Sequence, residues 1–335
     1  MSGLVKRLEW LMKVCLAVAM SIVWWRARRS VEPARAKQRV LLVRIDNRVG
    51  EALLTTPLID ALANAGHEVH VLTHPKMRRV LDGHPNVAKL HDYFAKWSVL
   101  SALRALRFDV VINCGNWDLE SVTSALVARA CGPKSVVVGP ANFPSGWLMD
   151  VGVAAMRDSR SEAAQRRHLG SPLVKMEGPA KLSFRPTREF RVVEGRYAVV
   201  NPGGRLGFRR VSPERFAAGA RALLERGVTP LVTWGPGEEA LVDEVVKLAP
   251  GAVRAPATTI DELASLMRGA ELTLCNNTGP MHLSVAVGCP TVALFLHMEV
   301  ARWGHAFAPH RMIDLTNAAN ADQLVAAGVQ VSAQS

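Results

Sequence analysis

The sequence predicts an α/β protein of two domains, each built around a parallel sheet. An apolar helix at the N-terminus precedes the first domain. From residue 39 onward, short apolar runs alternate with segments of helical periodicity, which is typical of strands connected by helices. This alternation occurs twice, on either side of a proline-containing stretch at 140–196 with little pattern. A chain of 335 residues, 49% of them hydrophobic, is long enough to bury two cores.

In the first repeat we expect strands at 40–45, 68–73, 87–90, 109–114 and 135–138, and helices near 52–65, 76–81, 99–106 and 120–130. In the second repeat we expect strands at 197–201, 229–233, around 253, at 271–275 and 291–295, and helices at 213–226, 238–248, 260–268 and 281–287. These patterns indicate two Rossmann-like domains facing each other. We expect the N-terminal helical segment at 1–38, the first domain at 39–185 and the second domain at 186–335. Ligands of such sheets bind at the carboxyl ends of the strands, so each strand-to-helix turn is a candidate site.

Positive charge is concentrated at the N-terminus. The chain has 41 Lys and Arg against 29 Asp and Glu, a net charge of +12, which favours an anionic partner. Residues 1–39 hold nine of these basic side chains with only Glu9 and Glu32, and so carry +7. Because the basic residues surround an apolar stretch, without interleaved aromatic residues outside it, we expect an anionic membrane surface as partner and no nucleic acid.

The apolar stretch is short for a membrane span. Residues 10–25 read WLMKVCLAVAMSIVWW, and a helix of this length covers about 24 Å of a hydrocarbon core of roughly 30 Å. The stretch ends in Trp24-Trp25-Arg26 without the small residues of a cleavage site, so we expect it to be retained. Three alternatives stay open: an interfacial helix that contacts an anionic leaflet through residues 4–29, a short true span, or a helix that packs on the protein.

Cysteines and histidines do not suggest a metal site. The five cysteines are scattered and form no Cys-x-x-Cys pair, so we expect reduced, mostly buried thiols and a cytoplasmic main body. His67, His70 and His74 fall on and around one expected strand, but His67 lies on the opposite face from the other two. We therefore expect no bound metal.

The turn after the first strand, at 44–51, places a carboxylate beside a glycine. Gly50 allows the close approach of a ligand. Glu51, at the start of a helix, either interacts with the helix N-terminus or acts as a general base aimed into the cleft. From these residues alone the helix-start role is favoured.

A second turn, at 201–210, contains three glycines and three arginines. The backbone of Gly203 and Gly204 together with guanidinium groups suits a phosphorylated ligand, and the alternative is a solvated basic loop. The following helix is expected to begin at Ser212 and Pro213.

Two later turns complete the candidates. An acidic residue at the next helix start, in 234–239, either holds ribose hydroxyls or only caps the helix. The segment CNNTGPMH at 275–282 ends a strand and starts a helix with Thr278 as N-cap, which presents free N–H groups to a phosphate. His282 is either functional or a buried structural histidine. Trp303 and His305, in a later loop, could flank a base or a sugar.

Two segments carry a family resemblance. RIDNRVGEALLTTPLIDAL at 44–62 is similar to R-x-x-x-x-G-D-x-x-x-T-x-P, and CNNTGPMHLSVAVGCPTVALF at 275–295 is similar to N-D-[ST]-G-x-x-H-x-A-x-A-x-G-x-P. Over roughly residues 39–310 the chain thus resembles glycosyltransferase family 9, the bacterial heptosyltransferases of lipopolysaccharide core synthesis. The resemblance implies a GT-B fold with nucleotide-heptose on the C-terminal domain and acceptor lipid on the N-terminal domain. It also implies inverting, metal-independent transfer without a cofactor, from a donor such as ADP-heptose, at the cytoplasmic face of the inner membrane.

The resemblance also implies roles for single residues. Glu51 stands where the family has its catalytic aspartate, Arg209 at its phosphate-binding lysine, and Glu239 at its ribose-binding glutamate. The expected donor side comprises Gly203, Gly204, Glu239, Asn277, Thr278, Gly279, Pro280, Met281 and His282, and the expected acceptor side comprises Arg44, Asn47 and Gly50.

Three positions depart from the family pattern: Glu51 replaces aspartate, Arg209 replaces lysine, and Asn277 replaces an acidic residue. Each keeps a usable chemical group, because a carboxylate accepts a proton, a guanidinium neutralises a diphosphate and an amide binds a sugar hydroxyl. The sequence therefore predicts transfer to a lipid-linked saccharide by a single in-line displacement. The alternatives are a catalytically weakened, membrane-attached sugar-nucleotide-binding subunit, and a GT-B transferase or epimerase that acts on another sugar nucleotide.

Overall fold

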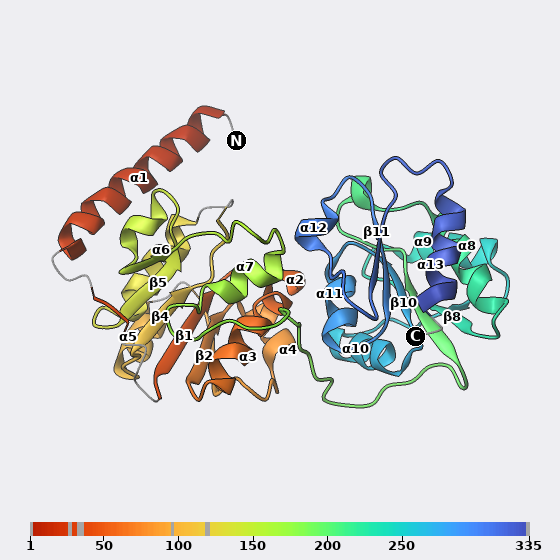
Figure 1. The fold of residues 1–335 in the computed structure, drawn as a ribbon, viewed down its shortest axis with the longest axis horizontal. Helices are drawn as coiled ribbons and strands as arrows, with labels where there is room; N and C mark the ends of the chain where they lie inside the picture. Colours follow the sequence, from red (N-terminus) through yellow and green to blue (C-terminus); the bar gives the residue numbers. More distant parts are fainter. Residues whose placement is uncertain (1–2, 26–28, 32–36, 95–96, 118–120, 333–335) are drawn as a thin grey trace. The chain divides into compact units, whose positions relative to one another are not determined.

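Two six-stranded parallel sheets form the framework of the protein (Figure 1). The computed structural model describes residues 3–25, 29–31, 37–94, 97–117 and 121–332. The chain divides into two compact units: unit 1 contains Met1–Asn47 and Thr55–Ala180, and unit 2 contains Arg48–Leu54 and Lys181–Ser335. The short segment Arg48–Leu54 thus lies in the second unit although its neighbours in sequence lie in the first.

The sheet of unit 1 has the strand order β3-β2-β1-β4-β5-β6. This is the 3-2-1-4-5-6 order of dinucleotide-binding sheets, in which the direction of winding reverses between the first and fourth strands. Its strands are β1 (Arg39–Arg44), β2 (Glu68–Thr73), β3 (Lys89–Asp92), β4 (Val110–Asn113), β5 (Val136–Pro140) and β6 (Val151–Val153).

Helices cover both faces of this sheet because alternate residues of each strand point to opposite sides. Val40 and Leu42 of β1 pack in the cluster that includes α3 (Thr56–Asn64). Leu41 and Val43 pack in the cluster that includes α5 (Trp97–Ala105) and α6 (Val122–Cys131). The remaining helical elements are η1 (Pro75–Met77), α4 (Arg78–Leu81), η2 (Ser145–Leu148) and α7 (Glu162–His168).

The helix expected over 52–65 is two helices, and this prediction was wrong in one respect. α2 (Val49–Leu53) ends before Leu54, and α3 starts anew at Thr56 with Pro57 in its first turn. Proline lacks a backbone N–H and fits the first turn of a helix rather than its interior, so a break here is physically reasonable. The start expected at residue 120 lies outside the described residues.

The N-terminal helix α1 (Gly3–Trp25) belongs to unit 1 and packs against η2 and α6. Met20 contributes to the same core cluster as Leu148. Among the described residues, none of the helices combines the length and the apolar composition needed to span a bilayer.

Unit 2 repeats the arrangement, with the strand order β12-β11-β10-β7-β8-β9. Its strands are β7 (Tyr197–Asn201), β8 (Thr229–Val232), β9 (Val253–Arg254), β10 (Thr273–Asn276), β11 (Thr291–Phe295) and β12 (Arg311–Asp314). Its helical elements are η3 (Gly207–Arg209), α8 (Pro213–Leu224), α9 (Glu239–Leu248), α10 (Ile260–Gly269), α11 (Gly279–Ala286), α12 (Val300–Trp303) and α13 (Ala321–Ser332). The last strand and helix lie beyond the elements expected from the sequence.

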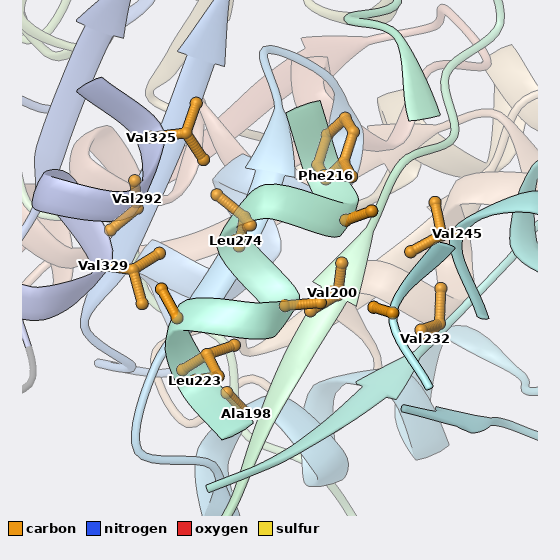
Figure 2. Packing of buried hydrophobic residues seen from close by; sticks show 14 of the residues in the cluster. Ala198, Val200, Phe216, Leu223, Val232, Val245, Leu274, Val292, Val325 and Val329 are labelled. Atoms are coloured by element: carbon orange, nitrogen blue, oxygen red, sulfur yellow. The ribbon is translucent and has the colours of Figure 1, made fainter. Parts of the chain in front are cut away.

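The main core of unit 2 lies between the sheet and helices α8, α9 and α13 (Figure 2). Phe216 of α8 is fully buried among Val200, Val245 and Leu274, which come from two strands and a neighbouring helix. On the other face of the sheet a smaller cluster contains Met281 of α11 with Phe295. The larger core of unit 2 therefore lies on the face of the sheet opposite α11.

We expect Phe216→Ala to lower the free energy of unfolding by about 3–5 kcal/mol, because truncation leaves a cavity that the packed core cannot close. The matched control is Phe208→Ala, since Phe208 is 63% exposed and its truncation should change stability by less than about 0.5 kcal/mol. Urea unfolding of both variants measures the difference. Equal effects of the two substitutions would contradict the packing described for Phe216.

Candidate donor site

Strands β7 and β10 are neighbours in the sheet of unit 2, and the winding reverses between them. At such a switch point the turns that follow the two strands diverge and leave room for a ligand at the carboxyl edge. The turn after β7 is the glycine- and arginine-rich segment at 202–210, and the turn after β10 leads through Asn277 into α11. Two of the turns singled out from the sequence therefore lie side by side.

The side chain of Asn276 connects these two turns. It is fully buried at the end of β10. Its Nδ2 donates to the carbonyl oxygens of Pro202 (2.8 Å) and Gly203 (3.2 Å), and its Oδ1 accepts from the backbone N–H of Val211 (3.0 Å). A single amide thus fixes both ends of the glycine-rich turn against the start of the next one.

Glu238 holds the glycine-rich turn from the other side. Its carboxylate accepts from the backbone N–H of Gly204 (2.7 Å) and of Gly235 (2.9 Å). The guanidinium of Arg210 lies 3.4 Å from the same carboxylate and also donates to the carbonyl oxygen of Gly204. A Cβ at Gly203 would come within 1.9 Å of Glu238 Oε2, so any side chain at this position would displace the Glu238 carboxylate.

The start of α11 faces the same turn. Thr278 occupies the N-cap position with extended backbone, and its hydroxyl donates to the carbonyl oxygen of Asn276 (3.4 Å). A Cβ at Gly204 would lie 2.8 Å from Thr278 Cγ2, so the two turns are in close contact. The first turn of α11 therefore directs backbone N–H groups and the positive end of the helix dipole toward this corner.

His282, the fourth residue of α11, connects the site to α2. A Cβ at Gly50 would come within 2.9 Å of His282 Cδ2 and 3.6 Å of Nε2, so the backbone of α2 lies directly on the edge of the ring. On the other side of the ring, His282 Nδ1 lies 2.9 Å from His305 Nε2. Burial, together with the neighbouring His282 and His310, lowers the pKa of His305 to about 2. His305 is therefore neutral at physiological pH and can fix the position of the His282 ring.

Glu51 follows Gly50 in the first turn of α2, so the carboxylate lies one residue from the contact with His282. The side chain is buried, and Arg48 Nη1 lies 3.5 Å from its carboxylate. Because Arg48 and Glu51 both belong to unit 2, the carboxylate and the turns described above share one compact unit.

Arg209 lies at the end of η3, and its guanidinium carbon sits 5.3 Å from the ring centroid of the exposed Phe208. Its Nε is buried and has no hydrogen-bond partner among the described residues. Arg210, the next residue, points instead into the glycine-rich turn. The two adjacent arginines thus have different surroundings.

A family model, glycosyltransferase family 9 (heptosyltransferase), matches residues 96–326. This chain belongs to glycosyltransferase family 9. A lipopolysaccharide heptosyltransferase 3 from Escherichia coli is 26% identical over 273 residues, which is 73% of this chain and 80% of that protein.

Solved structures share the fold. A family 9 glycosyltransferase from Veillonella parvula superposes with a TM-score of 0.71 at 21% identity, covering 83% of this chain and 86% of that one. The E. coli heptosyltransferase WaaC with ADP superposes with a TM-score of 0.75 at 16% identity, covering 88% of this chain and 99% of that one. The predicted α/β fold of the GT-B type and the predicted glycosyltransferase activity are thereby confirmed.

In this family 9 enzyme the predicted donor residues lie on the turns of unit 2. Glu239 is half-buried in the first turn of α9, and Asn277 is half-buried just before Thr278. Pro280 and Gly279 form the first turn of α11. The Met281 side chain is fully buried in the small core with Phe295, which leaves it a packing role.

The predicted acceptor residues are divided between the units. Gly50 lies with the donor residues of unit 2. Arg44 is buried in unit 1 at the end of β1, where its Nε lies 2.6 Å from Asp46 and its Nη1 donates to the carbonyl oxygen of Cys114. Asn47 is exposed in the turn after β1. These roles stay predictions.

Three residues of the site were missed by the sequence reasoning: Asn276, Glu238 and Arg210. Asn276 stands at the first position of the N-D-[ST]-G motif, but the motif does not show that its side chain binds backbone groups 65 to 74 positions away. The two-glutamate helix start at 238–239 was noted, but only the structure shows that Glu238 binds the glycine-rich turn. For Asn276 the sequence signal was its place in the family motif, as a polar residue that ends a buried strand.

The histidines considered for a metal have separate partners. His70 lies 2.9 Å from both His91 and Glu68, while His67 accepts from the backbone N–H of Gln38 and His74 from that of Lys76. Among the described residues no group of three or more His, Cys, Asp or Glu side chains could hold a metal ion.

Gly203→Ala tests the geometry of the glycine-rich turn. We expect it to lower the free energy of unfolding by about 1–3 kcal/mol, since the new methyl group displaces the Glu238 carboxylate from two partly buried N–H groups. The control is Gly207→Ala in the same turn, where a Cβ would have open space around it. Thermal unfolding compares the two variants, and a Gly203→Ala variant as stable as Gly207→Ala would refute the close contact.

His305→Leu tests the contact between the two histidines. We expect His282 to lose its single tautomer, because its Nδ1 no longer has a partner, and the free energy of unfolding to fall by about 1–3 kcal/mol. Nitrogen-15 NMR of histidine-labelled protein reports the tautomer. His305→Gln, which can restore a hydrogen bond, should recover most of the wild-type signal, whereas an unchanged His282 signal in His305→Leu would contradict the account.

Buried neutral histidines also predict a pH dependence of stability. Burial lowers the pKa of His305 to about 2 and that of His310 to about 4, while the unfolded chain protonates near 6.5. As the pH falls below about 6.5 the unfolded state binds more protons, so the free energy of unfolding should decrease by up to about 1.4 kcal/mol per pH unit for each histidine. Urea unfolding between pH 7.5 and 5.5 should show a weaker pH dependence in His305→Leu than in the wild type, and equal slopes would contradict these pKa values.

Proposed function

We propose that this family 9 enzyme transfers a heptose from ADP-heptose to a lipid-linked saccharide in lipopolysaccharide or related cell-envelope glycan synthesis. The observation that carries the proposal is the convergence in unit 2 of the glycine-rich turn, the start of α11 and the carboxylate-bearing α2. Support comes from the similarity to a lipopolysaccharide heptosyltransferase 3 and to the structure of WaaC with ADP.

The donor diphosphate would lie between the glycine-rich turn and α11. The N-terminal amides of α11 supply hydrogen bonds and a positive helix dipole. Arg209 supplies a guanidinium whose buried Nε has no protein partner among the described residues. Glu239 would bind the ribose, and Asn277 a sugar hydroxyl, as the family resemblance suggests.

Transfer would be a single in-line displacement with inversion at the anomeric carbon. The acceptor hydroxyl oxygen forms the new bond while its proton passes to the Glu51 carboxylate. The anomeric bond to phosphate breaks, and its electron pair leaves with the nucleotide diphosphate. Arg209 and the start of α11 stabilise this leaving charge, so the proposed reaction requires no metal ion.

We also propose that the enzyme acts at the cytoplasmic face of the inner membrane and binds its anionic surface through residues 4–29. The concentration of basic residues around the apolar N-terminal helix supports this attachment. Positions 26–28 lie outside the described residues.

The decisive experiment measures transfer from ADP-heptose to a panel of lipid-linked acceptors, with and without EDTA. We expect the wild type to transfer heptose in both conditions, and Glu51→Gln to lose at least about a hundredfold in rate because the general base is removed. ADP affinity, measured by calorimetry, should stay close to wild type in Glu51→Gln. The control Glu225→Gln removes an exposed carboxylate at the C-cap of α8 and should not change transfer.

The outcomes separate the candidate functions. Binding of ADP-heptose without turnover across the panel would favour a sugar-nucleotide-binding subunit. Full activity of Glu51→Gln would exclude Glu51 as the base. Absence of ADP binding would refute the assignment of the donor.

A further inference from the structure

One side of α1 presents a continuous apolar stripe to solvent. Among the described side chains of this helix, all the exposed apolar ones except Trp10 recur at steps of three or four residues, the spacing of a single helical face. Met12 and Ile22 are 68% and 67% exposed. The stripe, about 21 Å long at 1.5 Å per residue, consists of Leu8, Leu11, Met12, Cys15, Leu16, Ala19 and Ile22.

The other side of the helix packs on unit 1. Val14, Val18 and Met20 are partly buried, and Met20 joins the core cluster of Leu148. The helix is thus held against η2 and α6 while its stripe stays exposed. Contiguous exposed apolar surfaces of this kind usually mark a protein or membrane contact.

A second exposed apolar feature lies at η2, the element that α1 packs against. Phe143 and Trp147 are 53% and 46% exposed, and their ring centroids lie 5.0 Å apart in an edge-to-face arrangement. Leu148, next in sequence, is buried and anchors η2 to the core. Exposed Trp and Phe on a fixed turn are typical of groups that sit at the boundary between water and lipid.

Charge favours lipid over protein as the occupant of this surface. Lys6 and Arg7 precede the stripe in sequence, and Arg26, Arg28 and Arg29 follow it, of which positions 26 and 28 lie outside the described residues. An aliphatic stripe with basic residues at both ends complements the acyl region and the anionic headgroups of a bilayer.

We propose that the α1 stripe and the Phe143–Trp147 pair form one docking face for an anionic bilayer, with α1 lying in the plane of the interface. This inference rests on the membrane attachment proposed above and adds a second contact from the body of unit 1. Two contacts, one on the helix and one on η2, fix unit 1 on the lipid surface, whereas a helix alone would act as a tether.

The test is sedimentation of the full chain with vesicles of phosphatidylcholine, with or without phosphatidylglycerol. We expect binding to the anionic vesicles, and a decrease in affinity of about tenfold in the double variant Phe143→Ser and Trp147→Ser, since both rings lose their burial in lipid. The matched control is Phe94→Ser, because Phe94 is 55% exposed but follows β3 at the far edge of the same sheet. Its vesicle binding should equal that of the wild type.

A second pair of substitutions, Leu11→Ser and Leu16→Ser, tests the stripe and should weaken binding at least as strongly. Far-UV circular dichroism shows whether each variant is folded. Wild-type affinity in the Phe143 and Trp147 variant would overturn the proposal, and so would self-association of the chain through the stripe without vesicle binding. Because vesicle binding requires neither donor nor acceptor, a failure of heptose transfer would leave this measurement interpretable.

Discussion

The candidate site depends on the buried amide of Asn276. Its three hydrogen bonds join the end of β10 to both ends of the glycine-rich turn that follows β7. Apart from the short 3-10 helix η3, the two turns have no regular secondary structure between the strand and the next α-helix, so without this amide their backbone groups would have to find other partners at the switch point of the sheet. An apolar residue here would leave a buried N–H and two carbonyl oxygens unpaired, which is a large cost for any fold.

The remaining geometry of the site follows from close approach of backbone to side chains. Gly203 and Gly204 permit Glu238 and Thr278 to lie against the turn, and Gly50 permits α2 to lie on the ring of His282. Through this last contact Glu51, which precedes the turn into α3 by only a few residues, joins the compact unit that contains the donor residues. The two adjacent arginines differ, because the guanidinium of Arg210 lies beside the Glu238 carboxylate. The buried Nε of Arg209 has no hydrogen-bond partner among the described residues.

Much of the fold could be predicted from sequence because most strands are short segments rich in buried apolar residues. The strands expected at 68–73, 197–201 and 291–295 have those bounds in the structure. Local patterns also located the turns at which the site forms. The partners within the site could not be predicted, since Asn276 and Glu238 act on residues far away in sequence. β6, with three residues and a glycine at its centre, is too short to show a strand pattern.

We propose that the turns after β7 and β10 bind a nucleotide diphosphate in unit 2, and a crystal structure with ADP tests this binding most directly. We expect phosphate oxygens at the N–H of Gly279 and at the guanidinium of Arg209, beside Gly203 and Gly204, with the three hydrogen bonds of Asn276 intact. A diphosphate bound away from these turns, or a structure in which binding breaks the bonds of Asn276, would contradict it.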